Sequence, residues 1–271
     1  MVRSIFSLPA DIIKNRRLIA KLAWNDFRTR YAGSYLGIVW AFIQPIITIL
    51  VYWFVFSVGF RAGTGDLGIP FVLYLVAGIV PWFFFQDGLI GGTASLLEYN
   101  YLVKKVVFNI SVLPVVKILS AAVVHCFFVL FTIILYMGYG HFPDFYYLQI
   151  IYYSGCTFVL ILGISYFTCS VVVFFRDLSQ IISILLQVGI WLTPIMWVAE
   201  DALAGHETLA RILKFNPMYY IVSGYRDTFV KKEWFFMHPM WTLYFWIFAL
   251  LCLLAGGHVF KKLRVHFADV L

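Results

Sequence analysis

The sequence has 271 residues, of which 63% are apolar and only 12% are charged, about half the charged share of an ordinary soluble domain. A soluble fold of this size cannot cover so much apolar surface with polar side chains, so the surplus must face lipid. The net charge of +7 comes mainly from basic residues near the ends of apolar runs. There they bind lipid headgroups and determine the orientation of the chain in the membrane. Composition therefore predicts an all-α integral membrane protein and gives no reason to expect a nucleic-acid partner.

The first expected element is an amphipathic helix over residues 10–31. Its apolar side recurs at the 3.6-residue period, and basic residues lie on the other side. The apolar members are Ile12, Ile13, Ile19, Ala20, Ala23, Trp24, Phe27 and Tyr31. A basic face opposite Trp and Phe is typical of a helix in the headgroup plane. A soluble helix packed on another domain is the alternative.

Six apolar segments follow, and about 20 apolar residues of helix suffice to cross a bilayer core. The expected transmembrane helices are 36–60, 70–87, 113–137, 148–175, 178–198 and 239–260. Pro45 is expected to kink the first helix, and Pro81 interrupts the second. Residues 88–112 form a more polar stretch.

The segment 200–238 is too polar to cross the membrane as one helix. We expect an outer re-entrant or interfacial helical hairpin, which is tolerated where protein buries it. With both termini inside, cytoplasmic segments hold fourteen of the 20 Lys and Arg residues. The positive-inside rule therefore predicts a multi-pass plasma-membrane protein with both termini cytoplasmic.

Several kinds of chemistry are missing from the sequence. No Lys is followed by Ser or Thr, which excludes the Walker A phosphate loop. No His, Cys and Asp set has zinc spacing, and no Gly-x-Ser-x-Gly occurs. We therefore expect no catalytic residue, metal or cofactor in this chain. His125 stands alone in the third span, where a hydrogen bond to a neighbouring helix is a more common role than proton relay. The predicted spans carry no Asp, Glu, Lys or Arg at their centres, so the driving force is expected from a partner.

Aromatic residues make up 20% of the chain. Many suit the interfacial belt. The alternative is an aromatic path in which rings stack on the apolar faces of sugars. The candidates for this path are Tyr52, Trp53, Phe84, Phe85 and Trp191.

The order of these motifs resembles a known family. The basic helix runs into Asn25-Asp26-Phe27-Arg28-Thr29-Arg30-Tyr31, followed by Ser34-Tyr35-Leu36-Gly37, Trp40 and Gln44-Pro45, then by Arg176-Asp177 and Asn216-Pro217. Nearly the whole chain resembles the ABC-2 permeases that export O-antigen, capsule and teichoic acid. Further stretches are similar to wall teichoic acid permeases of the TarG/TagG type, namely 51–56, 68–71, 233–237 and 267–269.

The resemblance implies a single ABC-2 transmembrane domain over 1–271, working as a homodimer with two copies of an ATP-binding cassette subunit that binds ATP and Mg. It also implies a coupling helix within 96–109 that docks on the ATPase, with a solvated loop as the alternative. The coupling candidates are Leu96, Leu97, Glu98, Tyr101, Lys104, Lys105, Arg176 and Asp177.

The expected function is export of lipid-linked teichoic acid from the cytoplasmic to the outer face. Export of O-antigen, capsule or another lipid-linked polysaccharide is the alternative. A membrane glycosyl or acyl transferase would need paired carboxylates or a His/Asp set at one interface, which the sequence lacks. Arg28 and Arg30 are candidates to meet the carrier pyrophosphate. Plain headgroup anchoring, or an Asp26–Arg30 pair at helical spacing, are the alternatives.

Overall fold

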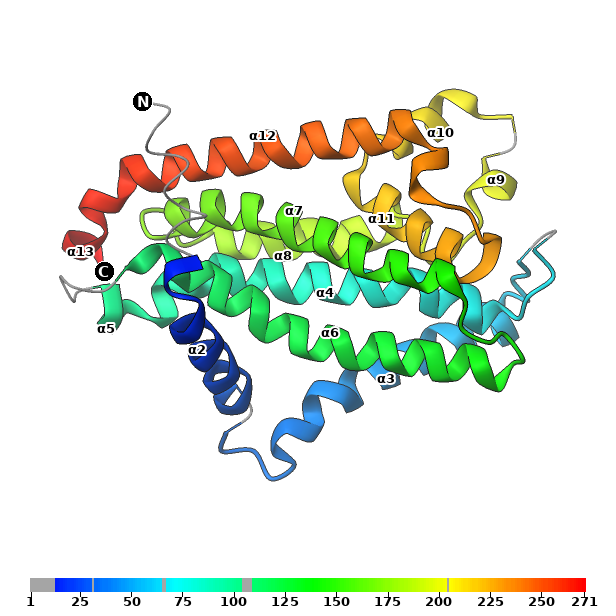
Figure 1. Cartoon of the computed structure of the whole chain (residues 1–271), viewed down its shortest axis with the longest axis horizontal. Helices are drawn as coiled ribbons and strands as arrows, with labels where there is room; N and C mark the ends of the chain where they lie inside the picture. Colours follow the sequence, from blue (N-terminus) through cyan, green and yellow to red (C-terminus); the bar gives the residue numbers. More distant parts are fainter. Residues whose placement is uncertain (1–12, 31, 65–66, 104–108, 204) are drawn as a thin grey trace.

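The computed structural model describes residues 13–30, 32–64, 67–103, 109–203 and 205–271. Within these ranges the chain folds into helices and forms no strand. The long helices α4, α6, α7 and α12 run side by side along the length of the molecule (Figure 1). The α-helices are α2 Arg16–Thr29, α3 Trp40–Trp53, α4 Phe71–Glu98, α5 Asn100–Val103, α6 Leu113–Gly138, α7 Gln149–Val172, α8 Leu178–Leu192, α9 Ala199–Ala202, α10 Glu207–Lys214, α11 Pro217–Arg226, α12 Pro239–Leu263 and α13 Phe267–Val270. The 3-10 and π segments are η2 Gly37–Val39, η3 Phe54–Gly59, η5 Ile110–Val112, η6 Phe145–Leu148, η7 Asp227–Lys231, η8 Phe235–Met237 and η9 Arg264–His266.

Five described segments are long and apolar enough to cross a membrane. They are Gly37–Gly59, Phe71–Glu98, Ile110–Gly138, Phe145–Val172 and Pro239–His266. The sixth expected span, 178–198, is shorter, because α8 has 15 residues and rises only about 22 Å. Thr193 leaves the helical region (φ −89°, ψ 128°) since the following Pro194 disfavours α geometry at that position. The chain is thus a multi-pass membrane protein with five full-length candidate spans and one short apolar helix among its described residues.

Helix α4 extends eleven residues beyond the expected end at residue 87. It runs unbroken through Pro81 to Glu98. The added turns are rich in Gly, Thr and Ser, which suggests a loop when the sequence is read alone. In the structure these small residues let α4 approach α7: a Cβ added to Gly92 would lie 2.2 Å from the Ser165 Oγ, and one added to Gly88 would lie 3.0 Å from Ile161. Small residues at membrane helix contacts work in this way.

The contact between α7 and α12 also depends on glycine. A Cβ added to Gly163 would lie 2.7 Å from the Leu253 amide nitrogen, and one added to Gly256 would lie 2.2 Å from the Gly163 carbonyl oxygen. The two backbones therefore touch directly at this crossing. Such close approach maximises van der Waals contact where lipid provides no hydrophobic drive between helices.

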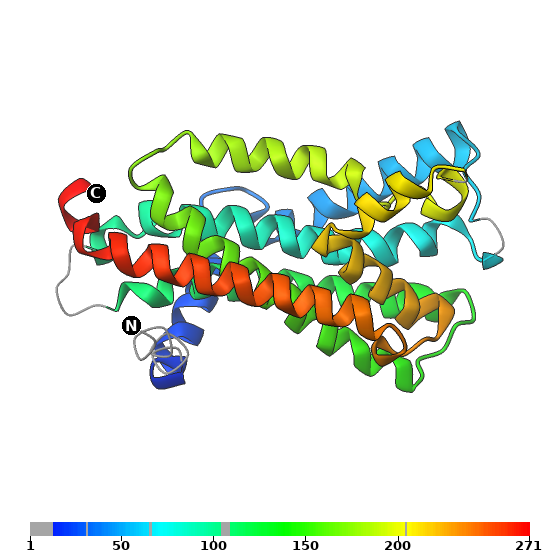
Figure 2. The same cartoon turned by 90° about the horizontal axis from the view of Figure 1, so that it is seen from above.

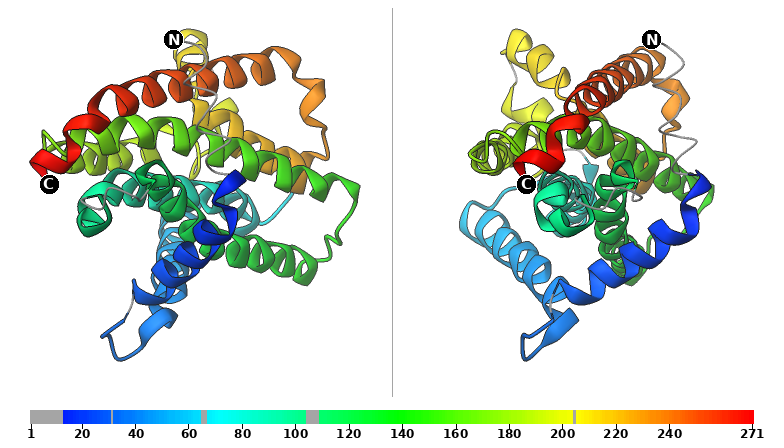
Figure 3. Two further views of the ribbon diagram at one scale, coloured as in Figure 1. Left: turned by 60° about the vertical axis from the view of Figure 1, so that its left-hand side comes forward. Right: turned by 90° about the vertical axis from the view of Figure 1, so that its left-hand side faces the viewer.

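Helix α2 lies across the long axis of the bundle rather than along it (Figures 1 and 3). Its Ile19, Ala23 and Phe27 are buried, together with Asp26. Trp24, expected on the same apolar face, is 54% exposed. The surface of α2 that packs on α6 is narrower than the apolar face of α2. Residues 10–12 and 31 of the expected helix lie outside the described part of the chain.

Helix α3 meets the bundle at a slant and is mostly exposed. Its lower end, next to α2, stands away from the other helices in Figure 1. Ala41 and Ile49 are its buried residues, and η3 continues it as a π-helix to Gly59. Pro45 lies inside α3. This arrangement leaves room between α3 and α4.

The segment before α12 folds back on the bundle at the end opposite α5 and α13. There α11 packs on α4 and α7, whereas α10 has no buried residue. Arg226 secures α11: its Nη1 and Nη2 donate to the carbonyl oxygens of Pro194 (2.6 Å) and Ile195 (2.8 Å). Its guanidinium carbon lies 3.6 Å from the centre of the Tyr74 ring. The buried cation is tolerated because two of its nitrogens donate to carbonyl oxygens and an aromatic face lies against it.

Candidate functional site

A cavity of about 290 Å³ lies between α3, α4, α6 and α8. Its walls combine rings, such as Trp40, Tyr52 and Phe84, with the amides of Gln44 and Gln86 and the carboxylate of Asp87. Apolar faces with a few hydrogen-bonding groups suit a polyol or sugar, whose faces are apolar and whose edges are polar. We call this cavity the groove.

The structure brings together some of the five aromatic candidates and separates others. Tyr52 and Phe84 line the groove. Trp191 is exposed and packs with its ring centre 6.4 Å from that of Tyr52. Phe85 is buried against Trp82, and Trp53 is 38% exposed, so neither contributes to the groove wall.

His125 forms part of the groove wall and is bonded to other helices. Its Nε2 lies 3.0 Å from both the Ser154 Oγ and the Tyr225 hydroxyl. Its ring stacks on Phe84 with centres 4.5 Å apart. The expectation that this histidine hydrogen-bonds to neighbouring helices is confirmed.

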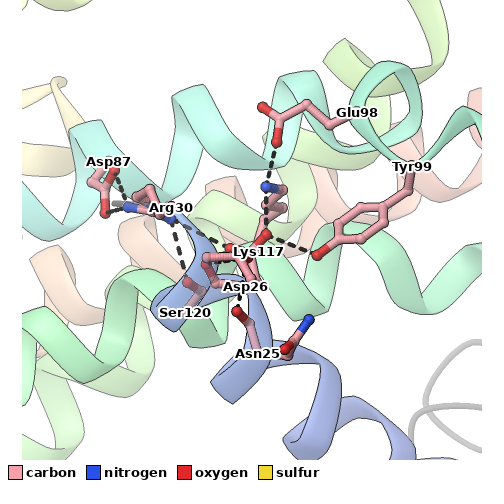
Figure 4. Close-up of polar contacts among 9 residues, drawn as sticks. Asn25, Asp26, Arg30, Asp87, Glu98, Tyr99, Lys117 and Ser120 are labelled. Carbon is pink, nitrogen blue, oxygen red and sulfur yellow. Dashed lines mark hydrogen bonds and ion pairs between the residues drawn. The ribbon is translucent and has the colours of Figure 1, made fainter. Parts of the chain in front are cut away.

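Beside the groove, α2, α4 and α6 meet through a set of charged side chains, which we call the charged junction (Figure 4). At its centre Lys117 of α6 is 7% exposed. Its Nζ donates to the Asp26 Oδ1 at 2.6 Å and forms a second, very short ion pair with Glu98. The Tyr99 hydroxyl donates to the same Asp26 oxygen at 2.8 Å. One ammonium group therefore ties the amphipathic helix to the C-terminal end of α4.

Arg30 forms the second half of the charged junction. Its Nη1 donates to both Asp87 oxygens, at 2.9 and 2.7 Å, and its Nη2 lies 3.4 Å from the Ser120 Oγ. The Asp26–Arg30 pair weighed from helical spacing is present at 3.7 Å. Because an anionic ligand would have to displace Asp87 from this guanidinium, the geometry favours a structural role for Arg30. Arg28 is exposed on α2.

The surroundings of Asp26 favour its ionised form. Burial of the Asp26 carboxyl acts to raise its pKa, but the hydrogen bond and charge of Lys117 and the hydrogen bonds from Tyr99 and Ser120 together outweigh burial. The pKa of Asp26 is therefore held below its ordinary value. Burial and the bond to Asp26 raise the pKa of Tyr99, so this phenol stays a donor.

The charged junction borders a second cavity, of about 410 Å³, lined by Asp26, Arg30, Glu98 and Lys117 among others. Asp87 and Ile90 line both this cavity and the groove. The Arg30–Asp87 pair therefore stands at the boundary between an aromatic space among the spans and a charged space beside α2.

The coupling candidates lie at the end of the bundle that carries the C-terminus. Leu96 is fully buried, whereas Tyr101 is 55% exposed. Leu97 is half-buried and Glu98 is exposed at the end of α4. Arg176 and Asp177 are exposed in the turn before α8, and neighbouring Phe174 contacts Phe267 near the same end. Lys104 and Lys105 lie outside the described residues.

Sequence reasoning missed Asp87, Lys117 and Ser120 as members of one site. It also expected spans without charge near their centres, whereas Asp87 lies inside the 28-residue α4. Its charge is tolerated because Arg30 reaches it from α2. One signal in the sequence was available. An ionisable residue inside an apolar helix needs a partner, and Lys117 lies four residues into the predicted third span.

Known proteins match most of the chain. It is 27% identical over 267 residues to an O-antigen export system permease protein of Myxococcus xanthus, covering 97% of this chain and 98% of the relative. It is 25% identical over 257 residues to the protein of the same name from Klebsiella pneumoniae, covering 94% and 95%. The ABC-2 type transporter family matches residues 17–230. With its bundle of apolar spans and its transverse first helix, the chain belongs to the ABC-2 type transporter family.

Proposed function

We propose that this chain is the permease subunit of an ATP-driven exporter that moves a lipid-linked polysaccharide of the O-antigen class across the plasma membrane. The observation that carries the proposal is the groove, with its rings and amides, in a chain that two O-antigen export relatives match over 97% and 94% of its length. The groove offers weak, repeated contacts, which suit a chain that must slide.

The energy source in this proposal is a separate ATP-binding cassette subunit. Two copies of it serve a homodimer of this chain, bound from the side of α5, Arg176 and α13, with both termini in the cytoplasm. The partner binds the ATP and Mg. The end of α4 and the Arg176-Asp177 turn are exposed on that side and are available for contact.

Teichoic acid is the second candidate cargo. The stretches 51–56, 68–71, 233–237 and 267–269 favour it, whereas the matched relatives are named for O-antigen. The relatives extend over almost the whole chain, so we rank the O-antigen class first.

Co-expression with a candidate ATP-binding cassette subunit from the same organism tests the proposal. We expect the two subunits to co-purify and ATPase activity to require the complex. Loss of this chain from the cell should leave the polymer inside the cell. Chemical analysis of the retained polymer distinguishes an O-antigen-type glycan from a polyol-phosphate chain. Turnover of a sugar donor by the purified chain alone would instead indicate a transferase.

Two neighbouring aromatic residues give a matched test of the groove. Tyr52→Ala removes a ring from the groove wall, and we expect export to fall about fivefold, which corresponds to the loss of one stacking contact of about 1 kcal/mol. Trp53→Ala, one residue on and outside the groove, should export normally. Surface polymer per cell, at equal protein level, is the measurement. Equal export by both variants would contradict a path along this wall.

A further inference from the structure

Three potential metal ligands meet at the end of the bundle opposite α5 and α13. Asp227 begins η7, Glu233 follows that segment, and His238 directly precedes α12 (orange in Figure 2). One ligand atom from each lies within 4.8 Å of the other two. The His238 Nε2 and the Glu233 Oε2 are 3.0 Å apart. Their spacing along the chain matches none of the usual spacings of zinc ligands. The three residues come together only because the backbone turns between η7 and α12.

The backbone around these three residues is held in place. The Glu233 amide donates to the Asp227 carbonyl oxygen at 3.1 Å. Gln149 of α7, which is buried, donates to the Glu233 carbonyl oxygen (2.8 Å) and accepts from the Phe235 amide (2.7 Å). Lys232 adopts the left-handed conformation (φ 59°) that the turn requires. The cluster is therefore pre-organised, as a binding site must be.

Asp227 has few partners for a carboxylate in its surroundings. The residue is 7% exposed, yet no group in the described ranges donates a hydrogen bond to its carboxylate. Its ion pair there is with the Lys231 Nζ at 4.0 Å, a contact longer than a hydrogen bond. A buried carboxylate normally has hydrogen bonds, an ion partner or a metal to offset its lost hydration.

We propose that Asp227, Glu233 and His238 bind a divalent transition-metal ion of the Zn²⁺ or Mn²⁺ class. Two carboxylates with one imidazole suit these ions better than Ca²⁺ or Mg²⁺, which favour oxygen alone. Zn–N and Zn–O bonds of about 2.1 Å at the tetrahedral angle place two ligand atoms roughly 3.4 Å apart, so His238 and Glu233, now 3.0 Å apart, need to separate by only about 0.4 Å to bind the ion. The Asp227 carboxylate completes the set by rotation about its side-chain bonds.

The bound ion would tie the end of the helical hairpin to the first turn of α12. Glu233 and His238 approach each other in the absence of metal through one hydrogen bond between half-exposed groups, which contributes little in water. A metal replaces that bond with three coordinate bonds and satisfies Asp227. The site is separate from the groove and the charged junction, and its existence does not depend on the transported cargo.

Metal binding by the purified full-length chain in detergent tests this proposal directly. After removal of metal with EDTA, we expect isothermal titration to show one Zn²⁺ per chain and the unfolding temperature to rise when Zn²⁺ is added; Mn²⁺ forms a second titration. Glu233→Gln and His238→Ala, both at half-exposed positions, should each weaken binding at least about tenfold and remove the stabilisation. Asp227→Asn keeps the shape of the buried residue and should also lose binding.

His206→Ala is the matched control, since His206 is an exposed histidine in the same part of the chain and outside the cluster. It should bind metal like the unmodified protein. The proposal is overturned if the unmodified chain binds neither ion, or if His238→Ala binds as tightly as His206→Ala. Neither result bears on export, so this proposal and the proposed function fail separately.

Discussion

Replacing Lys117 with methionine is expected to destabilise the protein by about 3 kcal/mol, because removing one partner of a buried ion pair leaves the other charge uncompensated. Asp26, which is 6% exposed in its side chain, loses its 2.6 Å donor. Arg30 remains 3.7 Å away, which keeps the loss at the low end of the range for such changes. Thermal unfolding in detergent, followed by intrinsic fluorescence, measures the effect.

The double variant Asp26→Asn with Lys117→Met is the matched control. It removes both buried charges, so we expect it to recover most of the lost stability. Glu98, the other partner of Lys117, is half-exposed, so water can solvate its charge when the lysine is gone. Equal instability of the single and double variants would show that packing of the lysine stem, rather than charge, holds the charged junction together.

The dependence on pH has a defined sign. The pKa of Asp26 is lowered in the fold from its ordinary 3.8, so its contribution is fully present above that pH and is lost as the pH falls through the folded pKa. Lys117→Met removes the charge that lowers the pKa. The acid limb of the stability profile should therefore move to higher pH in this variant.

The second large effect is expected at the crossing of α7 and α12. Gly256→Ala places a methyl group 2.2 Å from the Gly163 carbonyl oxygen and 3.0 Å from the Phe167 nitrogen. Both are backbone atoms, so the helices must separate, and overpacking of this kind costs about 3 kcal/mol. We expect a lower unfolding temperature and reduced yield of folded protein from membranes.

Gly155→Ala in α7 provides the comparison for this substitution. A Cβ at Gly155 would meet nothing within 4 Å, so the change should be neutral or stabilising by up to about 1 kcal/mol through helix propensity. If Gly155→Ala and Gly256→Ala have the same unfolding temperature, close backbone contact at the crossing does not explain the need for glycine at position 256.

Hydrophobic pattern alone predicted much of the helical architecture. The ranges expected for the third, fourth and last spans coincide closely with α6, α7 and α12, because long uncharged runs leave few alternatives in a membrane. The end of α4 was missed for a physical reason: Gly88, Gly91 and Gly92 weaken helix propensity in isolation, whereas packing against α6 and α7 favours them. Tertiary contact, which a single sequence does not display, decided the outcome.

The functional site was harder to predict than the helices. Of the five aromatic candidates, Tyr52 and Phe84 line the groove, whereas Trp53, Phe85 and Trp191 do not, and residue type alone does not distinguish the two groups. The charged junction joins residues 91 positions apart, Asp26 and Lys117. Helical spacing revealed the Asp26–Arg30 contact alone, since long-range pairing depends on how α2 crosses the bundle.

The continuity of α4 has a mechanical consequence. A helix of 28 residues is about 42 Å long, roughly 12 Å more than the bilayer core is thick, and Pro81 leaves it in one piece. Any push on Glu98 at one surface must tilt the whole rod. It would then shift Gly78, which lies about 30 Å along the helix and is buried against Arg226, so a movement started at one surface of the membrane is transmitted into the opposite half of the bundle.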